Sequence, residues 1–228
     1  MTMGSSLRTL AKGSGLALLG ISFQMGAGFI SRLEMSRYLG PSEFWIITAS
    51  TSFVFFTCTI LKLGLDTAVS RYIPRYSNPK RKKSVIGSAL ILTLPLAVLS
   101  SGVIINYSEA IATKLLNLPD ATPIIQVVAL IIPLFMTIQI ASASTRGYEL
   151  TLPKVIVKDI ALPGSRLIIT IILVYLSASL FDFAFVFLFA YLISALIGIY
   201  MIYKHTDLFN TDDKFDFEIK ELLIFSLP

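Results

Sequence analysis

The chain has 228 residues, of which 55% are hydrophobic and only 14% are charged. A typical soluble domain carries about 25% charged residues, so this composition excludes a water-soluble globular protein. The net charge of +5 does not indicate nucleic-acid binding, because the basic excess is concentrated in one short segment. No basic run interleaved with aromatic residues lies in a polar context.

The basic segment is 71–83, RYIPRYSNPKRKK, which contains no acidic residue. It lies between two uncharged runs, 44–61 and 84–108. A transmembrane helix needs about 20 apolar residues, and short basic loops between such helices stay on the cytoplasmic side. We therefore predict a multi-pass protein of the cell membrane with this segment inside, in contact with anionic membrane lipid.

Hydropathy predicts an all-α bundle of six transmembrane helices. The more basic joins fall on one side of this bundle, which places the N-terminus and residue 203 inside. The run that begins at Gly13 is too long for a signal peptide and is expected to be retained. The predicted spans, in chain order, are 13–31, 44–61 with an amphipathic end through residue 70, 84–108, 121–145, 160–181 and 183–203.

Four segments are expected along the chain. Residues 1–12 form a cytoplasmic tail, 13–203 the bundle, 204–220 a polar cytoplasmic linker, and 221–228 the start of a seventh helix. Seven or eight residues cannot span a membrane. Two explanations stay open: the chain is a fragment of a longer protein, or the gene product stops as this helix begins.

Polar residues within the spans mark candidate cavity walls. In the first span Gly20, Gln24, Gly28 and Ser31 share one helix face, which suits either a close packing seam with Gln24 bonded across it or a wet surface. In the fourth span Gln139, Ser142 and Thr145 form a stripe at three-residue steps. Such a stripe favours an interior wall over lipid contact. We predict Gln24, Gln139 and Ser142 as cavity-lining residues.

Arg166 is the sharpest single candidate. The uncharged stretch 167–181 is too short to span alone, so the fifth helix must include Arg166. With a start near residue 160, it lies roughly 9 Å from the cytoplasmic end. An intramembrane arginine is costly and marks a functional site by default, and a guanidinium facing a wet space suits phosphate or pyrophosphate. Snorkelling to the inner interface is the alternative.

Three further arginines lie at span ends. Arg32 and Arg37 follow the first span at its outer end, where Glu34 is spaced to pair with Arg37. Arg71 shares a face with Arg75 at the inner end of the second span. Anchoring to lipid phosphates is the simpler interpretation for Arg71, and surface anchoring for at least one of the outer pair.

Other features carry less chemistry. Pro95 and Pro133 are expected to kink their helices. Cys58 is expected to be a packing residue and His205 a solvated loop residue. The sequence has no Cys/His cluster, paired intramembrane carboxylates or phosphate-binding glycine loop, which argues against a metal, a cofactor or an enzyme. Asp66, beside Gly64, is interpreted as a helix-boundary residue.

Several stretches together resemble the polysaccharide-transporter branch of the multidrug/oligosaccharidyl-lipid/polysaccharide (MOP, MATE-like) exporter superfamily, of the O-antigen flippase type. The resemblance covers nearly the whole chain in order. The stretches that carry it are SRYLGPSEFWIITAS (36–50), LKLGLDTAVSRYIPRY (61–76), STRGYELTLPKV (144–155) and ELLIFSLP (221–228).

That resemblance implies one six-helix lobe of a two-lobe transporter, with the start of a second lobe. It implies a flippase that carries polyprenyl- or dolichyl-(pyro)phosphate-linked oligosaccharide outward by alternating access, with basic residues holding the anionic head. Arg32 and Arg166 are the first choices for this role, followed by Arg37 and Arg71. A second lobe or a second copy is an expected partner, because the family's path lies between two lobes.

Three alternatives stay open. A cation-coupled multidrug exporter of the same superfamily would be favoured by a mid-membrane carboxylate, and the sequence places no acid well inside a span. A membrane enzyme of envelope glycan assembly would be favoured by large outer loops, and the outer joins are short. A non-catalytic scaffold is the third.

Overall fold

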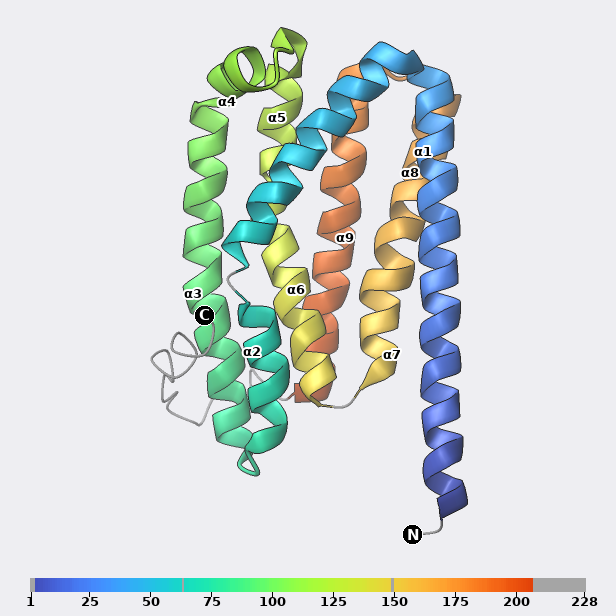
Figure 1. Cartoon of the computed structure of the whole chain (residues 1–228), viewed down its shortest axis with the longest axis vertical. Coiled ribbons are helices and arrows are strands. Elements are labelled where there is room, and N and C mark those ends of the chain that lie inside the picture. The colour runs from blue at the N-terminus through green and yellow to red at the C-terminus, as the bar shows by residue number, and fades with distance from the viewer. Residues whose placement is uncertain (1–2, 63, 149, 207–228) are drawn as a thin grey trace.

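The structure is a computed structural model that describes residues 3–62, 64–148 and 150–206. These residues form helices joined by short turns, and no strand occurs among them (Figure 1). The expected fold class, an all-α polytopic membrane protein, is confirmed. In chain order the elements are α1 (Met3–Leu61), α2 (Leu65–Tyr72), η1 (Ile73–Arg75), α3 (Pro79–Asn106), α4 (Ser108–Ala110), η2 (Ile111–Leu115), η3 (Pro119–Ala121), α5 (Thr122–Ala129), α6 (Ile131–Gly147), α7 (Thr151–Lys154), η4 (Val155–Ala161), α8 (Leu162–Tyr175) and α9 (Leu180–Thr206).

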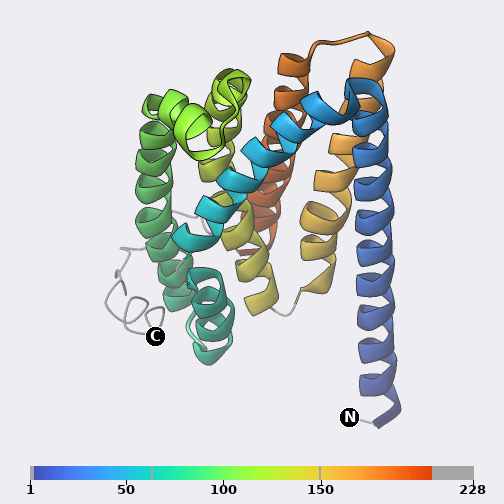
Figure 2. The ribbon, with the colours of Figure 1, turned by 45° about the horizontal axis from the view of Figure 1, so that its top comes forward.

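Element α1 folds back on itself at Gly40. This residue has φ 75° and ψ 175°, a backbone conformation that is essentially restricted to glycine, and Pro41 then starts a new helix. We call residues 3–39 the first arm and 41–61 the second arm. Figure 2 shows the second arm crossing back over the bundle. The expected join, 32–43, is therefore helical except at Gly40, and residues 3–12 continue the first arm.

The second arm ends at Leu61, and the chain turns at Gly64, whose φ of 73° lies in the left-handed region. Helix α2 then packs its apolar side, which includes Leu65 and Val69, against α3 and α6. An amphipathic continuation through residue 70 was predicted. The structure makes it a separate helix, because the left-handed turn at Gly64 ends the second arm.

Elements α5 and α6 form one bent segment, with an angle of 40° between them. Pro133 lies in the first turn of α6 and has no N–H to donate to the carbonyl of Ala129. The kink predicted at Pro133 is therefore confirmed. Helix α3 is unbroken through Pro95, and the kink predicted there stays a prediction.

Elements α7, η4 and α8 follow one another without a break from Thr151 to Tyr175. The predicted start of this span near residue 160 is wrong, because the helix also contains the charged residues Lys154, Lys158 and Asp159. Hydropathy missed these residues because they pair within the bundle instead of ending the helix. Element η4 is a π-helix, a form that occurs frequently at functional sites.

The core lies between α6, α9 and the second arm of α1. Every side chain from Ile138 to Thr145 is buried, which confirms that the polar stripe of this segment faces the interior. Cys58 is fully buried, as expected of a packing residue. His205 belongs to the last turn of α9, not to a loop, because a helix can continue beyond its apolar run into water.

Three stretches of the described helices are long and apolar enough to cross a membrane singly, and the bent α5–α6 pair makes four. One of them, Gly13–Leu61, contains the reversal at Gly40, while α7–α8 is divided into shorter pieces. The chain is a multi-pass membrane protein; the number of six spans stays a prediction. Large apolar side chains such as Leu19, Leu99 and Leu196 are exposed on the outside, as contact with lipid requires.

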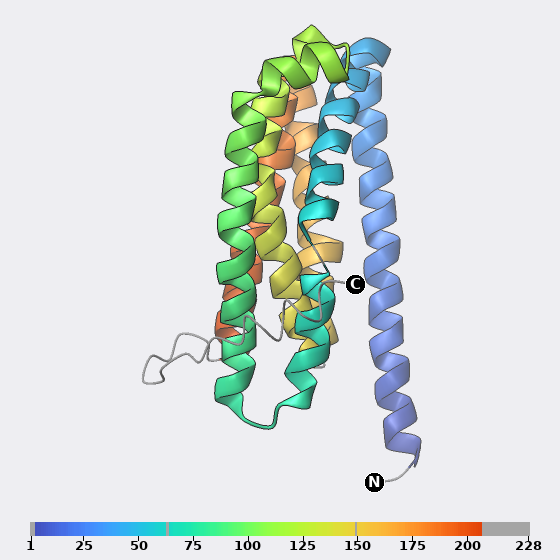
Figure 3. The ribbon, with the colours of Figure 1, turned by 60° about the vertical axis from the view of Figure 1, so that its left-hand side comes forward.

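The basic run marks one of the two ends of the bundle. The start of α1 and the turn between α2 and α3 lie at one end, which Figure 3 shows at the bottom. The basic run 80–83 lies at this end. The bend within α1 and the short helix α4 lie at the opposite end (Figure 1). The expected orientation, with the basic end inside, stays a prediction, as do the four expected segments. Residues 207–228, which include most of the predicted linker and the whole predicted start of a seventh helix, lie outside the described residues.

Candidate functional site

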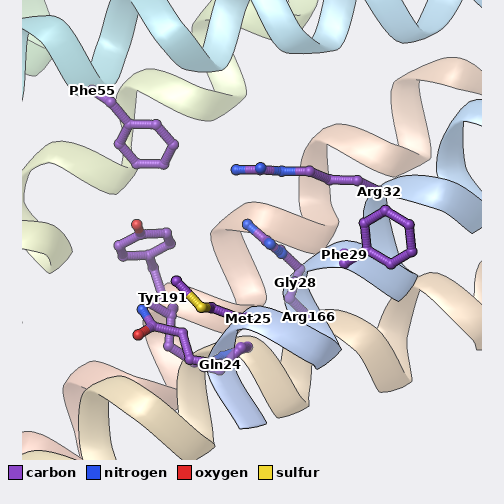
Figure 4. Close-up of a pocket in the computed structure, with 10 residues that line it drawn as sticks. Gln24, Met25, Gly28, Phe29, Arg32, Phe55, Arg166 and Tyr191 are labelled. Atoms are coloured by element: carbon purple, nitrogen blue, oxygen red, sulfur yellow. The ribbon is translucent and has the colours of Figure 1, made fainter. Parts of the chain in front are cut away.

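A cavity of about 540 Å³ opens between the first arm of α1, α8 and α9. Its size lies in the range of small-molecule binding sites. The close-up in Figure 4 shows the guanidinium groups of Arg32 and Arg166 projecting toward the same space. The lining residues are Gln24, Met25, Gly28, Phe29, Arg32, Phe55, Leu162, Pro163, Arg166 and Tyr191.

The two arginines come from different helices and have different surroundings. Arg32 is an exposed residue of the first arm. Arg166, in α8, is half-buried, and its guanidinium carbon lies 5.6 Å from the centre of the Phe187 ring. The Nε atom of Arg166 is buried without a hydrogen-bond partner. Gly28 faces this side chain: a Cβ atom there would lie 3.4 Å from Nη2 of Arg166, which is an ordinary contact distance.

No carboxylate neutralises these arginines within the part of the chain that the structure describes. The ion pairs there include those of Arg37 with Glu34, Lys62 with Asp66, and Lys154 with Asp159. None of these residues lines the cavity. The cavity wall therefore carries two positive charges in an apolar setting, which is an arrangement suited to an anion.

The seam between α1 and the α7–α8 segment brings the arginines together. A Cβ atom on Gly20 would lie only 2.7 Å from Cγ1 of Val155, so the helices approach closely at that point. Nearer to Gly40 along the same seam, the hydroxyls of Ser31 and Thr170 are 3.0 Å apart and share a hydrogen bond. Of the two alternatives for this helix face, the close packing seam occurs at Gly20 and Ser31. Gln24, on the same face, lines the cavity.

Aromatic rings form the wall that faces the arginines. The ring centres of Phe55 and Tyr191 are 5.8 Å apart, and the Phe135 ring lies behind both, at 6.3 and 6.1 Å. These rings come from the second arm of α1, α6 and α9. We call Phe55 and Tyr191 the aromatic wall of the cavity.

The chain matches a known protein family over most of its length. Residues 10–228 match the model of a family described as polysaccharide biosynthesis protein. The chain belongs to this family. No curated protein matches it in a sequence search. The expected resemblance to the polysaccharide-transporter branch of the MOP superfamily is confirmed.

A solved structure of a MOP superfamily transporter from Pyrococcus furiosus shares the fold of this polysaccharide biosynthesis protein. The TM-score is 0.68 at 17% sequence identity, and the match covers 92% of the chain but 46% of the transporter. The chain therefore spans about half the length of that protein. The Pyrococcus protein is described as having a binding pocket of reverse polarity, which suggests a different function for it.

The depth of the two arginines differs from the sequence prediction. Because the helical segment starts at Thr151, Arg166 lies roughly 22 Å beyond that end and about 14 Å before Tyr175. Arg32 lies about 12 Å along the first arm from Gly40, not at the outer end of its helix. Both residues are therefore far from the ends of their helices, and Arg166 lies farther from the start of its helix than predicted.

Gln139 and Ser142 do not line the cavity. Both are buried in α6, where the Lys158 ammonium donates a 3.1 Å hydrogen bond to Oε1 of Gln139. Lys154 lies 3.8 Å from Asp159 in the same helical segment, and Asp159 is only 3% exposed. The stripe therefore contacts, through Gln139, a charged cluster of Lys154, Lys158 and Asp159 in which only Asp159 is fully buried. Sequence reasoning missed this cluster because it treated residues 146–159 as a loop.

Arg37 and Arg71 also lie outside the cavity. Arg37 is exposed and pairs with Glu34 at 3.8 Å, so the predicted ion pair is confirmed. Arg71 is exposed at the end of α2, near the opposite end of the bundle. Of the four predicted arginines, the fold brings together only Arg32 and Arg166.

Phe55 and Tyr191 were not singled out in the sequence. Each is one of several aromatic residues in an apolar helix, a normal feature of membrane spans. They are separated by well over a hundred positions in the chain, so no local pattern could have linked them. Only their contact in the fold marks them as part of one site.

Proposed function

We propose that the protein is a flippase, or one lobe of a flippase, that exports polyprenyl- or dolichyl-(pyro)phosphate-linked oligosaccharide across the cell membrane. Family membership and a fold shared with half of a MOP transporter support export during polysaccharide biosynthesis. One observation carries the choice of ligand. Two guanidiniums point into one cavity whose lining, within the described part of the chain, includes no acidic residue.

The arginines would lower the free-energy cost of moving phosphate through hydrocarbon. A phosphate that leaves water loses its hydrogen bonds, and an unpaired charge in an apolar medium is strongly disfavoured. Arg32 and Arg166 would supply charge-assisted hydrogen bonds in place of water, while the lipid tail stays in the bilayer. Alternating access would then expose the cavity to each side in turn, and the protein would perform no covalent chemistry.

A second lobe, or a second copy of the chain, would complete the transport path. The chain covers 46% of the Pyrococcus transporter, which supports an opposite side of the path that is supplied by such a lobe or copy. The basic end of the bundle, with the run 80–83, would face the cytoplasm. In that orientation the start of α1 also lies inside.

Flipping in proteoliposomes tests the proposal. Vesicles would contain a polyprenyl-diphosphate-linked disaccharide, and a lectin added outside would report its appearance in the outer leaflet. We expect Arg166→Ala and Arg32→Ala each to slow flipping about 10- to 100-fold, since hydrogen bonds to charged groups are the strongest of their kind. Arg37→Ala is the matched control and should flip at the normal rate. Undiminished flipping in both cavity variants, at normal folded yield, would contradict the proposed mechanism.

Accessibility of the cavity gives an independent check. Cysteines placed at positions 32 and 166, in a Cys58→Ala background, should react with a water-soluble maleimide. Pyrophosphate should slow both reactions if it binds between the two positions. Cysteines that are sealed from the reagent at both positions would exclude a wet path at this site.

Cation-coupled export is a second candidate, and one observation favours it. The sequence suggested that no acid lies well inside a span, but Asp159 is buried within the α7–α8 segment. Lys154, whose Nζ lies 3.8 Å from Oδ2 of Asp159, provides a counter-charge, but this oxygen accepts no hydrogen bond. Export that depends on a proton or sodium gradient and is abolished by Asp159→Asn would favour the second candidate.

A further inference from the structure

The cavity has two chemically different walls. Arg32 and Arg166 form the cationic side, and Phe55 and Tyr191 form the aromatic wall (Figure 4). A bare phosphate uses only the cationic side. The aromatic wall is therefore suited to a second ligand group that lies close to the phosphate.

The Tyr191 hydroxyl gives the strongest indication of what this group is. Tyr191 is only 8% exposed, yet its hydroxyl makes no hydrogen bond with any residue that the structure describes. The hydroxyl oxygen is accessible from the cavity and is not sealed in the core, and a tyrosine hydroxyl can both donate and accept. The residue lines the cavity, so a polar ligand group there would satisfy it.

The Phe55 ring supplies the complementary apolar contact. It lies 5.8 Å from the Tyr191 ring at an angle of 39°, and Phe135 supports both rings from behind. This support fixes the two ring faces in space. A hexose ring has hydroxyls at its edge and a face of C–H groups, so it can stack on one aromatic face while it hydrogen-bonds a neighbouring hydroxyl.

We propose that Phe55 and Tyr191 bind the sugar directly attached to the phosphate, so that the cavity recognises a glycosyl phosphate and not a phosphate alone. This inference rests on the proposed function, because it assumes that Arg32 and Arg166 hold the phosphate. Gln24 lies on the same cavity wall as Arg32 and offers a further amide for sugar hydroxyls. A phospholipid headgroup shares the phosphate but lacks the sugar ring.

Calorimetric titration of the purified full chain tests this assignment. The probes are inorganic phosphate, glycerol 3-phosphate as a headgroup analogue, geranyl phosphate, and the 1-phosphates of glucose, galactose and N-acetylglucosamine. We expect at least one sugar 1-phosphate to bind about 10-fold more tightly than glycerol 3-phosphate, as one stacking contact plus one hydrogen bond would give.

Two variants separate the aromatic wall from the arginines. Tyr191→Phe, which removes only the hydroxyl, and Phe55→Leu should each reduce the preference for the sugar phosphate about 3- to 10-fold. Glycerol 3-phosphate should bind these variants as it binds the wild type. Arg166→Gln should weaken both ligands together. Tyr200→Phe and Phe189→Leu, at exposed positions of α9 outside the cavity, are the matched controls and should change nothing.

The outcomes distinguish this inference from the proposed function. Equal binding of sugar phosphates and glycerol 3-phosphate overturns the sugar site but leaves the phosphate site standing. A preference that survives both aromatic variants also overturns it. Tightest binding of geranyl phosphate, lost in Phe55→Leu and retained in Tyr191→Phe, assigns the wall to the lipid tail. Absence of binding by every probe overturns both proposals.

Discussion

The side-chain hydroxyl of Ser101 donates a hydrogen bond of 2.9 Å to the backbone carbonyl of Ala129. In an unbroken helix the N–H of residue 133 would bond to this carbonyl, but residue 133 is a proline. Ser101 therefore satisfies the acceptor that Pro133 leaves free, and it joins α3 to the bend between α5 and α6. The bend lies in the segment that carries Phe135 behind the aromatic wall.

We expect Ser101→Ala to lower the free energy of unfolding by about 1–3 kcal/mol, because it leaves a buried carbonyl without a donor. The variant Pro133→Ala restores an N–H to the helix. The double variant should therefore lose less stability from Ser101→Ala than the wild type does. Unfolding temperatures measured in detergent provide the comparison. Strictly additive losses would show that the two residues do not share this carbonyl.

The reversal at Gly40 gives a second prediction. A Cβ atom at this position would meet nothing within 4 Å, so Gly40→Ala introduces no clash. Its backbone conformation should nevertheless cost about 1–3 kcal/mol for any other residue. Gly26→Ala is the control, since it is equally open and helical, and it should be neutral or stabilising. Equal unfolding temperatures for the two variants would contradict the assigned backbone conformation.

The seam beside the cavity gives a third prediction. Gly20→Ala would place a Cβ atom 2.7 Å from Cγ1 of Val155, and overpacking of this kind costs about 1–3 kcal/mol. Val155→Ala removes the atom in closest contact. A double-mutant cycle by thermal unfolding should therefore show that the two substitutions compensate. A coupling energy near zero would place the helices farther apart than the structure does.

The charged cluster of Lys154, Lys158 and Asp159 gives a fourth prediction. Gln139→Leu removes the acceptor for the Lys158 ammonium, which is 3.1 Å away, and should destabilise the protein by about 1–3 kcal/mol. Replacing both partners, with Gln139→Leu and Lys158→Met, should recover much of that loss because no polar group is then left unpaired. Unfolding temperatures of the single and double variants test this. A double variant less stable than either single variant would indicate another partner for Lys158.

Membrane class and the general course of the chain follow from the sequence. Long apolar runs have few alternatives to helices in a bilayer, because every backbone group must be bonded within the segment. The low share of charged residues indicates the membrane class, and the basic run 80–83 indicates which end of the bundle faces the cytoplasm. The face shared by Gly20, Gln24 and Gly28 was also readable, since helical spacing is a local property.

The ends of the helices and the composition of the site were not readable in the same way. Hydropathy ended the first span before Arg32 and started the fifth near residue 160, because it counts each charge as a cost. In the fold, Lys154 and Asp159 offset each other's charge, and Lys158 bonds to Gln139. These helices therefore continue through their charged residues, and Arg166 lies farther from the start of its helix than expected.

Long-range contact decided which of the candidates form one site. The sequence offered four arginines, with Arg32 and Arg166 ranked first. Only these two share a cavity, because α1 and α8 pack along the Gly20–Ser31 seam. The second arm of α1 folds back at Gly40 toward α9, and this reversal places Phe55 beside Tyr191 in that cavity. Local chemistry determines which residues can bind an anion. The packing of helices that are distant in the sequence determines which of these residues can bind one anion together.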